Sequence, residues 1–330
     1  LARREWLSKL TGGFAEPWTF GERVRDWLLP RLEDFDIIHD NQTLANGILD
    51  LQAAGMPVVT TIHHPITRDL RVALKSESSW WRRLLIRRWH SFLLMQARVA
   101  SQLDHIVTVS ALSAKDIVAD FGVSPHTIKV VPNGVDTGLF RPLPSQHRKA
   151  RQVIATASAD APLKGLPVLL AAIKTLSQNF KSLELVLIAR TESGGKTEVL
   201  INQLNLTERV RFVSGLTREE IVRLYAESSV AVIPSLYEGF GLPAVEAMSC
   251  GIPVVSSNGG ALPEVIGEAG LVVPAGDEQA LAKAIFRVLT DSELAEALSL
   301  KGLERAQAQY SWSVCARDMV TFYRRAIREC

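Results

Sequence analysis

Residues 234–257 read PSLYEGFGLPAVEAMSCGIPVVSS, and this stretch decides both the fold and the chemistry. An apolar run leads into a loop with Gly239 and Gly241, and Pro243 follows where the first turn of a helix accepts a proline. A helix therefore begins near Leu242, with its first amide N–H groups pointing into the loop. Because glycine lets a ligand approach the backbone and a helix N-terminus attracts anions, the stretch predicts a phosphate site.

Two acids frame this turn, Glu238 in the loop and Glu246 about one turn inside the helix. Both can face the crevice at the carboxyl ends of the strands, where doubly wound sheets bind ligands. We expect each carboxylate to accept two sugar hydroxyls. The alternative interpretation makes Glu246 an ordinary early-helix acid favoured by the helix dipole, and Glu238 a loop charge.

Similar apolar runs recur along the chain, and most are continuously apolar, as strands buried on both faces must be. They cover residues 36–40, 58–62, 106–109, 128–131, 153–157, 183–189, 210–213, 230–233, 253–256 and 271–273. Helical patterns lie between them, at residues 43–54, 111–121, 166–180, 218–227 and 278–289. This alternation predicts an α/β fold of doubly wound parallel sheets covered by helices.

The alternation is interrupted at residues 133–151, where turn residues and polar side chains replace the apolar runs. We therefore expect two Rossmann-like domains, an N-terminal one over residues 1–140 and a C-terminal one over residues 151–309. An amphipathic helix follows at residues 310–330. Only four strands precede the interruption. One further helical pattern, at residues 22–32, lies before the first of these strands. We expect the first strand or strands of the N-terminal domain to be missing, and the chain to be a fragment.

Composition narrows the class of protein. A chain of 330 residues that is 47% hydrophobic and 22% charged is neither disordered nor fibrous. The three cysteines, Cys250, Cys315 and Cys330, form no C-x-x-C pair, which excludes a zinc knuckle and a disulfide framework and favours a reducing, cytoplasmic location. No run approaches the ~20 apolar residues of a membrane-spanning helix.

Charge is unevenly distributed despite a net charge of +2. Residues 68–98 hold eight Arg and Lys against two acids, a net charge of +6 that leaves −4 for the rest of the chain. On a helix, one stripe would hold Trp81, Leu84, Leu85, Trp89, Phe92 and Leu93. The interpretation we favour is that the stripe packs on the domain core with the arginines in water. The alternative is that the helix lies on an anionic membrane, which would give peripheral contact with the inner membrane face through residues 80–98. No motif indicates nucleic-acid binding.

The spacing E-GFGLPAV-E resembles the retaining glycosyltransferases of family four, which have the GT-B fold. The segments VVPNGVDTGLFRP at residues 130–142 and SNGGALPEVIGEAGLVVPAGD at residues 257–277 are similar to the same family. The resemblance covers nearly the whole chain from residue 36, and its E-x7-E motif is highly specific. It implies two domains facing a cleft, a final helix that crosses back to the N-terminal domain, a nucleotide-diphosphate sugar held mainly by the C-terminal domain, and no metal or other cofactor.

The resemblance also implies roles for single residues. Glu238 would hold hydroxyls of the donor sugar and Glu246 the ribose hydroxyls. The backbone of Phe240, Gly241 and Leu242 would hold the diphosphate and the sugar.

The family's diphosphate clamp is an Arg after the first C-terminal strand plus a Lys in a Lys-Gly pair. Lys164 and Gly165 match the pair, but residues 156–158 read TAS where the Arg would stand. A cation is needed because the departing diphosphate gains negative charge, and without a metal only Lys, Arg or helix N–H groups can neutralise it. We expect Lys164 to serve, and Arg190 is a candidate for the missing Arg.

A histidine pair ends the second apolar run. In the family a His in T-x-H reaches the donor sugar, and Thr61-Ile62-His63 has that spacing. His63 is therefore the third predicted catalytic residue beside Lys164 and Glu238, with His64 as the alternative. Without the resemblance, the pair reads as one packed and one exposed histidine. Zinc is excluded because no third ligand has a suitable spacing.

These features predict a glycosyltransferase that moves a hexose from a nucleotide-diphosphate sugar to the hydroxyl of an acceptor, with retention and without metal. The acceptor is expected to be a glycan, a lipid-linked molecule or a small molecule. Two alternatives stay open: a non-catalytic nucleotide-sugar-binding or scaffold subunit, and a sugar-nucleotide epimerase of the same fold.

Overall fold

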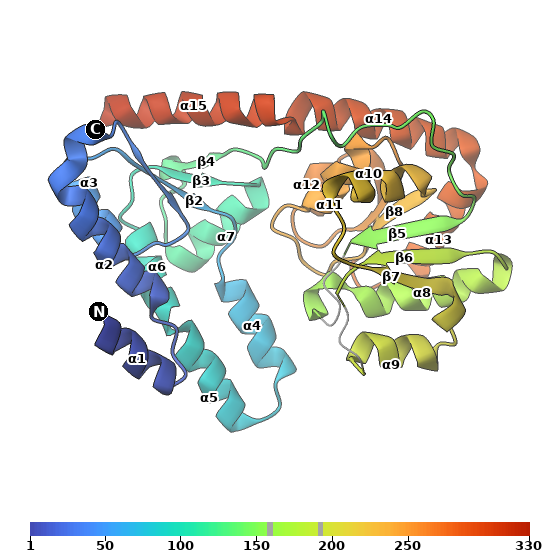
Figure 1. Cartoon of the computed structure of the whole chain (residues 1–330), viewed down its shortest axis with the longest axis horizontal. Coiled ribbons are helices and arrows are strands. Elements are labelled where there is room, and N and C mark those ends of the chain that lie inside the picture. Colours follow the sequence, from blue (N-terminus) through green and yellow to red (C-terminus); the bar gives the residue numbers. More distant parts are fainter. Residues whose placement is uncertain (157–160, 191–193) are drawn as a thin grey trace. The chain divides into compact units, whose positions relative to one another are not determined.

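The computed structural model describes residues 1–156, 161–190 and 194–330, which divide into two compact units. Unit 1 comprises Leu1–Val131 and Arg317–Cys330, and unit 2 comprises Pro132–Ala316. Each unit has its own parallel sheet with helices around it (Figure 1), which confirms the predicted α/β fold class.

The sheet of unit 1 has the order β1-β2-β3-β4, and neighbouring strands run parallel. Its strands are β1 (Ile38–Asn41), β2 (Val58–Ile62), β3 (Ile106–Thr108) and β4 (Ile128–Val130). The helices are α1 (Ala2–Leu10), α2 (Glu16–Leu28), α3 (Asn46–Ala53), α4 (Thr67–Ser76), α5 (Trp80–Trp89), α6 (Leu93–Ala100) and α7 (Ala111–Phe121), with the 3-10 turns η1 (Leu29–Asp34), η2 (His90–Phe92) and η3 (Pro125–Thr127). The helix predicted over residues 22–32 begins earlier, at Glu16, with Pro17 in the first turn of α2, and it passes into η1 at Leu29.

Helices cover both faces of this sheet. One face packs Val58, Ile62 and Ile106 against apolar side chains of α2, α3, α6 and α7. The alternate residues of the same strands, Val59 and Val107, pack against Phe322 of helix α15 (Trp312–Glu329) on the other face. The end of the chain therefore completes the core of unit 1, because a strand's successive side chains point to opposite faces.

The sheet of unit 2 has the order β10-β9-β8-β5-β6-β7 and is also parallel. Its strands are β5 (Gln152–Thr156), β6 (Glu184–Ile188), β7 (Val210–Val213), β8 (Val230–Ile233), β9 (Val254–Ser257) and β10 (Gly270–Val273). The helices are α8 (Leu166–Asn179), α9 (Lys196–Gln203), α10 (Arg218–Glu227), α11 (Leu242–Ser249), α12 (Leu262–Ile266), α13 (Glu278–Thr290) and α14 (Ser292–Tyr310), with the turns η4 (Pro162–Lys164) and η5 (Thr207–Arg209).

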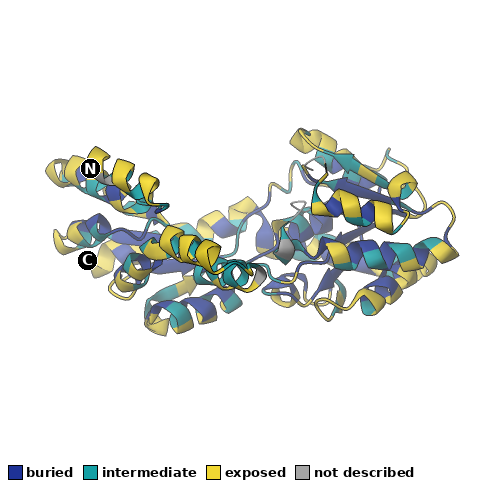
Figure 2. Ribbon diagram, turned by 90° about the horizontal axis from the view of Figure 1, so that it is seen from below, coloured by how far each residue is buried: buried dark blue, intermediate teal, exposed yellow. Residues whose placement is uncertain are grey.

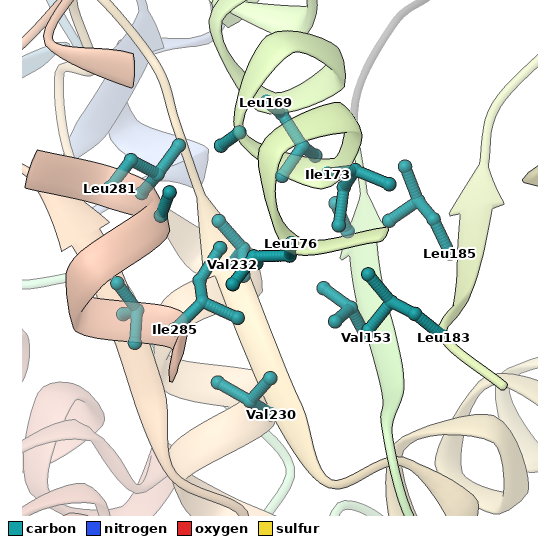
Figure 3. Packing of buried hydrophobic residues seen from close by; sticks show 14 of the residues in the cluster. Val153, Leu169, Ile173, Leu176, Leu183, Leu185, Val230, Val232, Leu281 and Ile285 are labelled. Atoms are coloured by element: carbon teal, nitrogen blue, oxygen red, sulfur yellow. The ribbon is translucent and has the colours of Figure 1, made fainter. Parts of the chain in front are cut away.

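The core of unit 2 is an apolar layer between the sheet and helices that include α8 and α13. Leu169, Ile173 and Leu176 of α8 and Ile285 of α13 pack onto Val232 and its neighbours on the central strands (Figure 3). Buried residues concentrate in the strands, whereas the surrounding helices carry exposed residues on one side (Figure 2). This burial explains why the strand sequences are continuously apolar.

The basic aromatic segment differs from its prediction in two ways. The helix over residues 80–93 is broken, because η2 separates α5 from α6. Leu93 is buried, but no described residue of α5 is, and Trp81, Leu84, Leu85 and Trp89 are each about half exposed, at 48%, 52%, 48% and 48%. The stripe packs in part on the segment between α1 and α2, since the Trp89 ring stacks on Phe14 at 4.8 Å between centroids, but it is not part of the buried core of unit 1. In the part of the chain that the structure describes, no helix has the length and apolarity needed to cross a membrane.

Candidate active site

The centre of the site lies where the strand order of unit 2 reverses. Strand β5 pairs with β6 on one side and with β8 on the other, so the helices that follow β5 and β8 leave the sheet in opposite directions. In doubly wound sheets ligands bind at this position, outside the carboxyl ends of the strands. The segment after β5 carries Lys164 and the segment after β8 carries Glu238.

Lys164 and Glu238 meet although 74 positions separate them in the chain. Lys164 Nζ donates a hydrogen bond to Glu238 Oε1 at 2.8 Å, and the two side chains are 33% and 14% exposed. Ser235 Oγ donates to the same carboxylate oxygen, also at 2.8 Å. Two donors therefore orient one oxygen of Glu238, and both predicted catalytic residues of unit 2 lie together at its strand ends.

Three glycines allow neighbouring segments to approach the loop of Glu238 closely, because they have no side chain. A Cβ at Gly165 would lie 2.0 Å from the carbonyl oxygen of Pro234, and a Cβ at Gly260 would lie 2.1 Å from that of Glu238. Gly259 is equally close to the loop, since its Cβ would lie 2.2 Å from the oxygen of Ser235. Both Gly165 (φ +64°) and Gly260 (φ +67°) are in the left-handed region, which other residues rarely adopt. The sequence predicted Gly165 only as part of the Lys-Gly pair.

Hydrogen bonds join the same segments. Leu236 N donates to Leu163 O at 2.7 Å and Ala261 N donates to Glu238 O at 2.8 Å. Ser257 Oγ donates to the carbonyl oxygen of Ser235. The loop of Glu238 is therefore fixed between the segment of Lys164 and the SNGG turn that begins at residue 257.

Helix α11 starts as predicted. Gly241, at φ 99°, precedes Leu242, the first helical residue, and Pro243 occupies the first turn. The side chain of Phe240 is buried and its ring lies edge-on to Tyr310 at 5.6 Å, so only its backbone is available to a ligand. The side chain of Leu242 is exposed. Pro243 has no backbone N–H, and Ala244 N donates to Gly241 O at 2.9 Å, so the N–H of Leu242 is the group in the first turn of α11 that can bind an anion.

Glu246 occupies a more buried position on α11. Burial raises the pKa of its carboxyl from 4.5 to about 7, and the positive charge of Arg218 and a hydrogen bond from Tyr225 offset part of that rise. Tyr225 is fully buried, and its hydroxyl lies 3.2 Å from Thr156 Oγ1. Arg218 and Tyr225 were not predicted as site residues, because each reads as part of an ordinary amphipathic helix.

His63 lies in unit 1, directly after β2. Its Nε2 is 2.9 Å from Asn41 Oδ1, and its pKa is lowered by burial and by the neighbouring His64 and His39. His64 pairs instead with Asp69, at 3.0 Å from Nε2 to Oδ2. Both side chains are half-buried, which differs from the expectation of one packed and one exposed histidine.

The Arg of the family's diphosphate clamp would stand at residues 156–158. Thr156 ends β5, whereas Ala157 and Ser158 lie outside the described residues. Arg190 is exposed after β6, and within the described ranges no hydrogen bond or ion pair joins it to Lys164 or Glu238. Among the described residues no cluster of three His, Cys, Asp or Glu side chains could hold a metal ion.

Family models match both halves of the chain. Residues 4–139 match the model of glycosyltransferase family 4, and residues 143–305 match that of glycosyl transferases group 1. The MMP alpha-(1->4)-mannosyltransferase of Mycolicibacterium hassiacum is 46% identical over 327 residues, which cover 98% of this chain and 78% of that protein. The phosphatidyl-myo-inositol mannosyltransferase of Mycobacterium leprae is 30% identical over 91% of this chain and 76% of its own length.

Solved structures agree with the fold. Sucrose-phosphate synthase from Thermosynechococcus elongatus superposes with a TM-score of 0.74 at 25% identity, covering 94% of this chain and 78% of that one. Anabaena HepE in complex with UDP gives a TM-score of 0.72 at 20% identity, over 91% of this chain and 80% of its own. The two Rossmann-like units, the E-x7-E loop at the strand ends and the 46% identical relative lead to one conclusion: this chain belongs to the family 4 glycosyltransferases of the GT-B fold.

Proposed function

We propose that this glycosyltransferase moves a mannosyl residue from a nucleotide-diphosphate sugar to an acceptor hydroxyl, with retention at the anomeric carbon and without a metal ion. The sugar is proposed from the similarity to the 46% identical relative, an alpha-(1->4)-mannosyltransferase. The observation that carries the proposal is the Lys164–Glu238 pair beside the N-terminus of α11. A cation, the start of a helix and a carboxylate lie within one set of loops, which supports the proposal because these are the groups that a diphosphate and a sugar require.

Each group has a task in the proposed reaction. Lys164 and the N-terminus of α11 bind the diphosphate and stabilise the charge that develops on it as it departs. Glu238 accepts hydroxyls of the transferred sugar and is oriented for this by the hydroxyl of Ser235. Glu246 accepts the ribose hydroxyls, and His63 contacts the sugar from unit 1.

The proposed chemistry takes place on one face of the sugar. The bond between the anomeric carbon and the diphosphate oxygen breaks, and this oxygen takes the proton of the acceptor hydroxyl. The acceptor oxygen then forms its bond to the anomeric carbon on the face that the diphosphate left. Retention follows from this geometry, and the diphosphate acts as the base.

The test combines binding and turnover. A thermal-shift screen of nucleotide sugars identifies the donor, because a ligand that binds only the native state raises the melting temperature. With that donor, Lys164→Ala should lower kcat by about 10²- to 10³-fold. Lys181→Ala, an exposed lysine on the same unit, is the matched control and should leave kcat unchanged. Binding of the donor without any turnover in the presence of candidate acceptors would favour the non-catalytic subunit instead.

We also propose that helix α5 contacts the inner membrane face, which would bring the enzyme to a lipid-linked acceptor. Residues 80–98 contain five arginines and no acid, and half-exposed tryptophans and leucines lie on the same helix. Tryptophan and arginine together are typical of helices that lie in the interface of an anionic bilayer. Within the described residues, Arg83 and Arg87 form no ion pair, so their charges are available to lipid headgroups.

A further inference from the structure

The loop after β1 has an uncommon backbone. Gln42 and Leu44 have φ values of +60° and +52°, in the left-handed region that residues other than glycine rarely occupy. Such a backbone conformation is unfavourable and persists only where its surroundings hold it in place. Leu44 is fully buried, so the loop cannot relax by turning that side chain into solvent. Strain of this kind is typical of loops that hold a functional group in a fixed position.

Two side chains hold the loop in this conformation. The carboxylate of Asp40 accepts hydrogen bonds from Thr43 N at 3.1 Å and from Leu44 N at 3.0 Å. Gln96 Nε2 donates to the carbonyl oxygens of Gln42 and Thr43, both at 3.2 Å. The bonds come from β1 and from α6, so two separate elements fix the same turn.

The side chain of Gln42 in turn holds the histidine pair. Its Oε1 accepts from the backbone N–H of His63 at 2.8 Å, and its Nε2 donates to the backbone oxygen of His64 at 2.9 Å. Both ends of one amide are therefore used on the two residues that follow β2. This arrangement fixes the direction in which the His63 imidazole leaves the sheet.

Asn41, the last residue of β1, fixes the imidazole itself. Its Oδ1 lies 2.9 Å from His63 Nε2. An amide oxygen only accepts hydrogen bonds, so Nε2 must carry the proton and Nδ1 must carry a lone pair.

The surroundings of His63 favour the neutral ring. Burial lowers the pKa of His63, and the neighbouring His64 and His39 lower it further. His39 is hydrogen-bonded to Thr61 and to Tyr323. Two acids of the same region have other partners, since Asp69 pairs with His64 and Asp40 accepts from the loop after β1. A neutral imidazole that carries its proton on Nε2 can accept a hydrogen bond at Nδ1.

We propose that Asn41 and Gln42 are positioning residues that fix the tautomer and direction of His63, so that Nδ1 accepts a hydrogen bond from a sugar hydroxyl. This inference rests on the proposed function for the identity of the ligand, whereas the tautomer belongs to the protein alone. The hydroxyl can belong to the donor sugar or to the acceptor.

The first experiment does not need activity. Long-range ¹H–¹⁵N spectra of the full chain with labelled histidine distinguish the two neutral tautomers, and His63→Gln assigns the signal. We expect His63 to carry its proton on Nε2, and Asn41→Ala to yield a mixture of tautomers. A proton on Nδ1 in the native protein, or a tautomer that is unchanged in Asn41→Ala, would overturn the proposal.

The second experiment tests the role of Asn41 in turnover by measuring how the rate depends on pH. Asn41→Asp introduces a carboxylate beside Nε2, which favours the imidazolium. The acidic limb of the pH–rate profile should then move to higher pH, by about one pH unit. Asn179→Asp, an exposed position at the end of α8, is the control and should leave the profile unchanged. An Asn41→Asp profile identical to that of the native enzyme would contradict the proposal.

The KM values of the two substrates show which of them supplies the hydroxyl that His63 binds. Gln42→Met keeps the length of the side chain but removes both hydrogen bonds, and we expect about a 3- to 10-fold loss of kcat/KM. A higher KM for the nucleotide sugar assigns the hydroxyl to the donor, and a higher KM for the acceptor assigns it to the acceptor. If the native chain has the expected tautomer but no transferase activity, the proposed function fails while the tautomer assignment stands. Full activity in Gln42→Met would reject the positioning role.

Discussion

The Nζ atom of Lys164 lies 2.8 Å from Oε1 of Glu238, so the two charges that the proposed reaction needs neutralise each other across two loops. A diphosphate that binds Lys164 has to share this cation with Glu238. The pair is only partly exposed, which makes the competition stronger than it would be between charges in water.

This competition predicts opposite effects of Glu238→Gln on binding and on turnover. The variant keeps the size of the side chain but frees the charge of Lys164, so a nucleoside diphosphate should bind several-fold more tightly. Turnover of the nucleotide sugar should fall by about 10²-fold, because the neutral amide is a weaker acceptor for the sugar hydroxyls. Calorimetry and steady-state kinetics measure the two effects. Glu208→Gln, at an exposed position, is the control, and weaker diphosphate binding in Glu238→Gln would contradict the competition.

The buried Glu246 predicts a pH dependence of stability. Its pKa is raised to about 7, so the native state favours the protonated form, and ionisation above the unfolded value of 4.5 costs stability until the pH passes about 7. Glu246→Gln lacks this penalty. The melting temperature of the variant should exceed that of the native chain at pH 8 and approach it near pH 4.5. The free-energy difference at pH 8 is at most about 3 kcal/mol.

The same carboxyl predicts a pH dependence of binding. The ionised form accepts the ribose hydroxyls better than the acid, so the affinity for a nucleotide should rise as the pH increases through about 7. Isothermal titration calorimetry from pH 6 to pH 8 measures the trend, which Glu246→Gln should abolish. Glu268→Gln, at an exposed site, should keep it. An equal pH dependence in Glu246→Gln would show that another group is responsible.

The close approach at Gly260 predicts a large cost for a single methyl group. In Gly260→Ala the added Cβ would lie 2.1 Å from the backbone oxygen of Glu238, so the SNGG turn and the loop of Glu238 have to separate. We expect a loss of more than about 3 kcal/mol in the free energy of unfolding, together with a loss of turnover. Gly215→Ala is the matched control, since Gly215 has a similar φ of +69° but nothing within 4 Å of its Cβ. Its cost should be on the order of 1–3 kcal/mol, from backbone strain alone, and equal costs for the two variants would argue against the contact.

The exposed helix α5 predicts binding to anionic liposomes. The native chain should float with vesicles that contain phosphatidylglycerol and not with pure phosphatidylcholine, and salt should weaken the association. Replacement of Arg82, Arg83 and Arg87 by Glu should abolish flotation. The same charge change at Arg317, Arg324 and Arg328, on α15, is the control.

Two outcomes would count against the membrane contact. One is flotation without preference for anionic lipid. The other is a dimer, detected by light scattering, that the triple α5 variant converts to a monomer, because the surface would then belong to a second copy of the chain.

The sequence predicted those parts of the molecule in which local pattern and burial agree. The strands could be located because a strand covered on both faces, such as β2 or β8, must be apolar throughout. The start of α11 could be located because Gly241 and Pro243 fix the backbone there. In both cases the physical constraint acts on neighbouring residues.

Contacts between distant residues could not be predicted in this way. The hydrogen bond between Lys164 and Glu238 depends on which strands are neighbours in the sheet. The sequence of neither segment indicates this strand order. The strained conformation of Gln42 has no local signal, since glutamine gives no preference for positive φ. The exposure of α5 was also outside the pattern, because an amphipathic stripe looks the same whether or not something covers it.

The last helix has a consequence for how the chain folds during synthesis. Phe322 and Ala326 of α15 are part of the core of unit 1, although nearly two hundred residues of unit 2 come between them and the strands that they cover. Domains usually fold from the N-terminus onward as they leave the ribosome. Here unit 1 cannot complete its core until Arg317–Cys330 has been made, while Pro132–Ala316 is a continuous segment that can fold before it. A nascent chain stopped short of Phe322 would therefore present an uncovered sheet face in its older half.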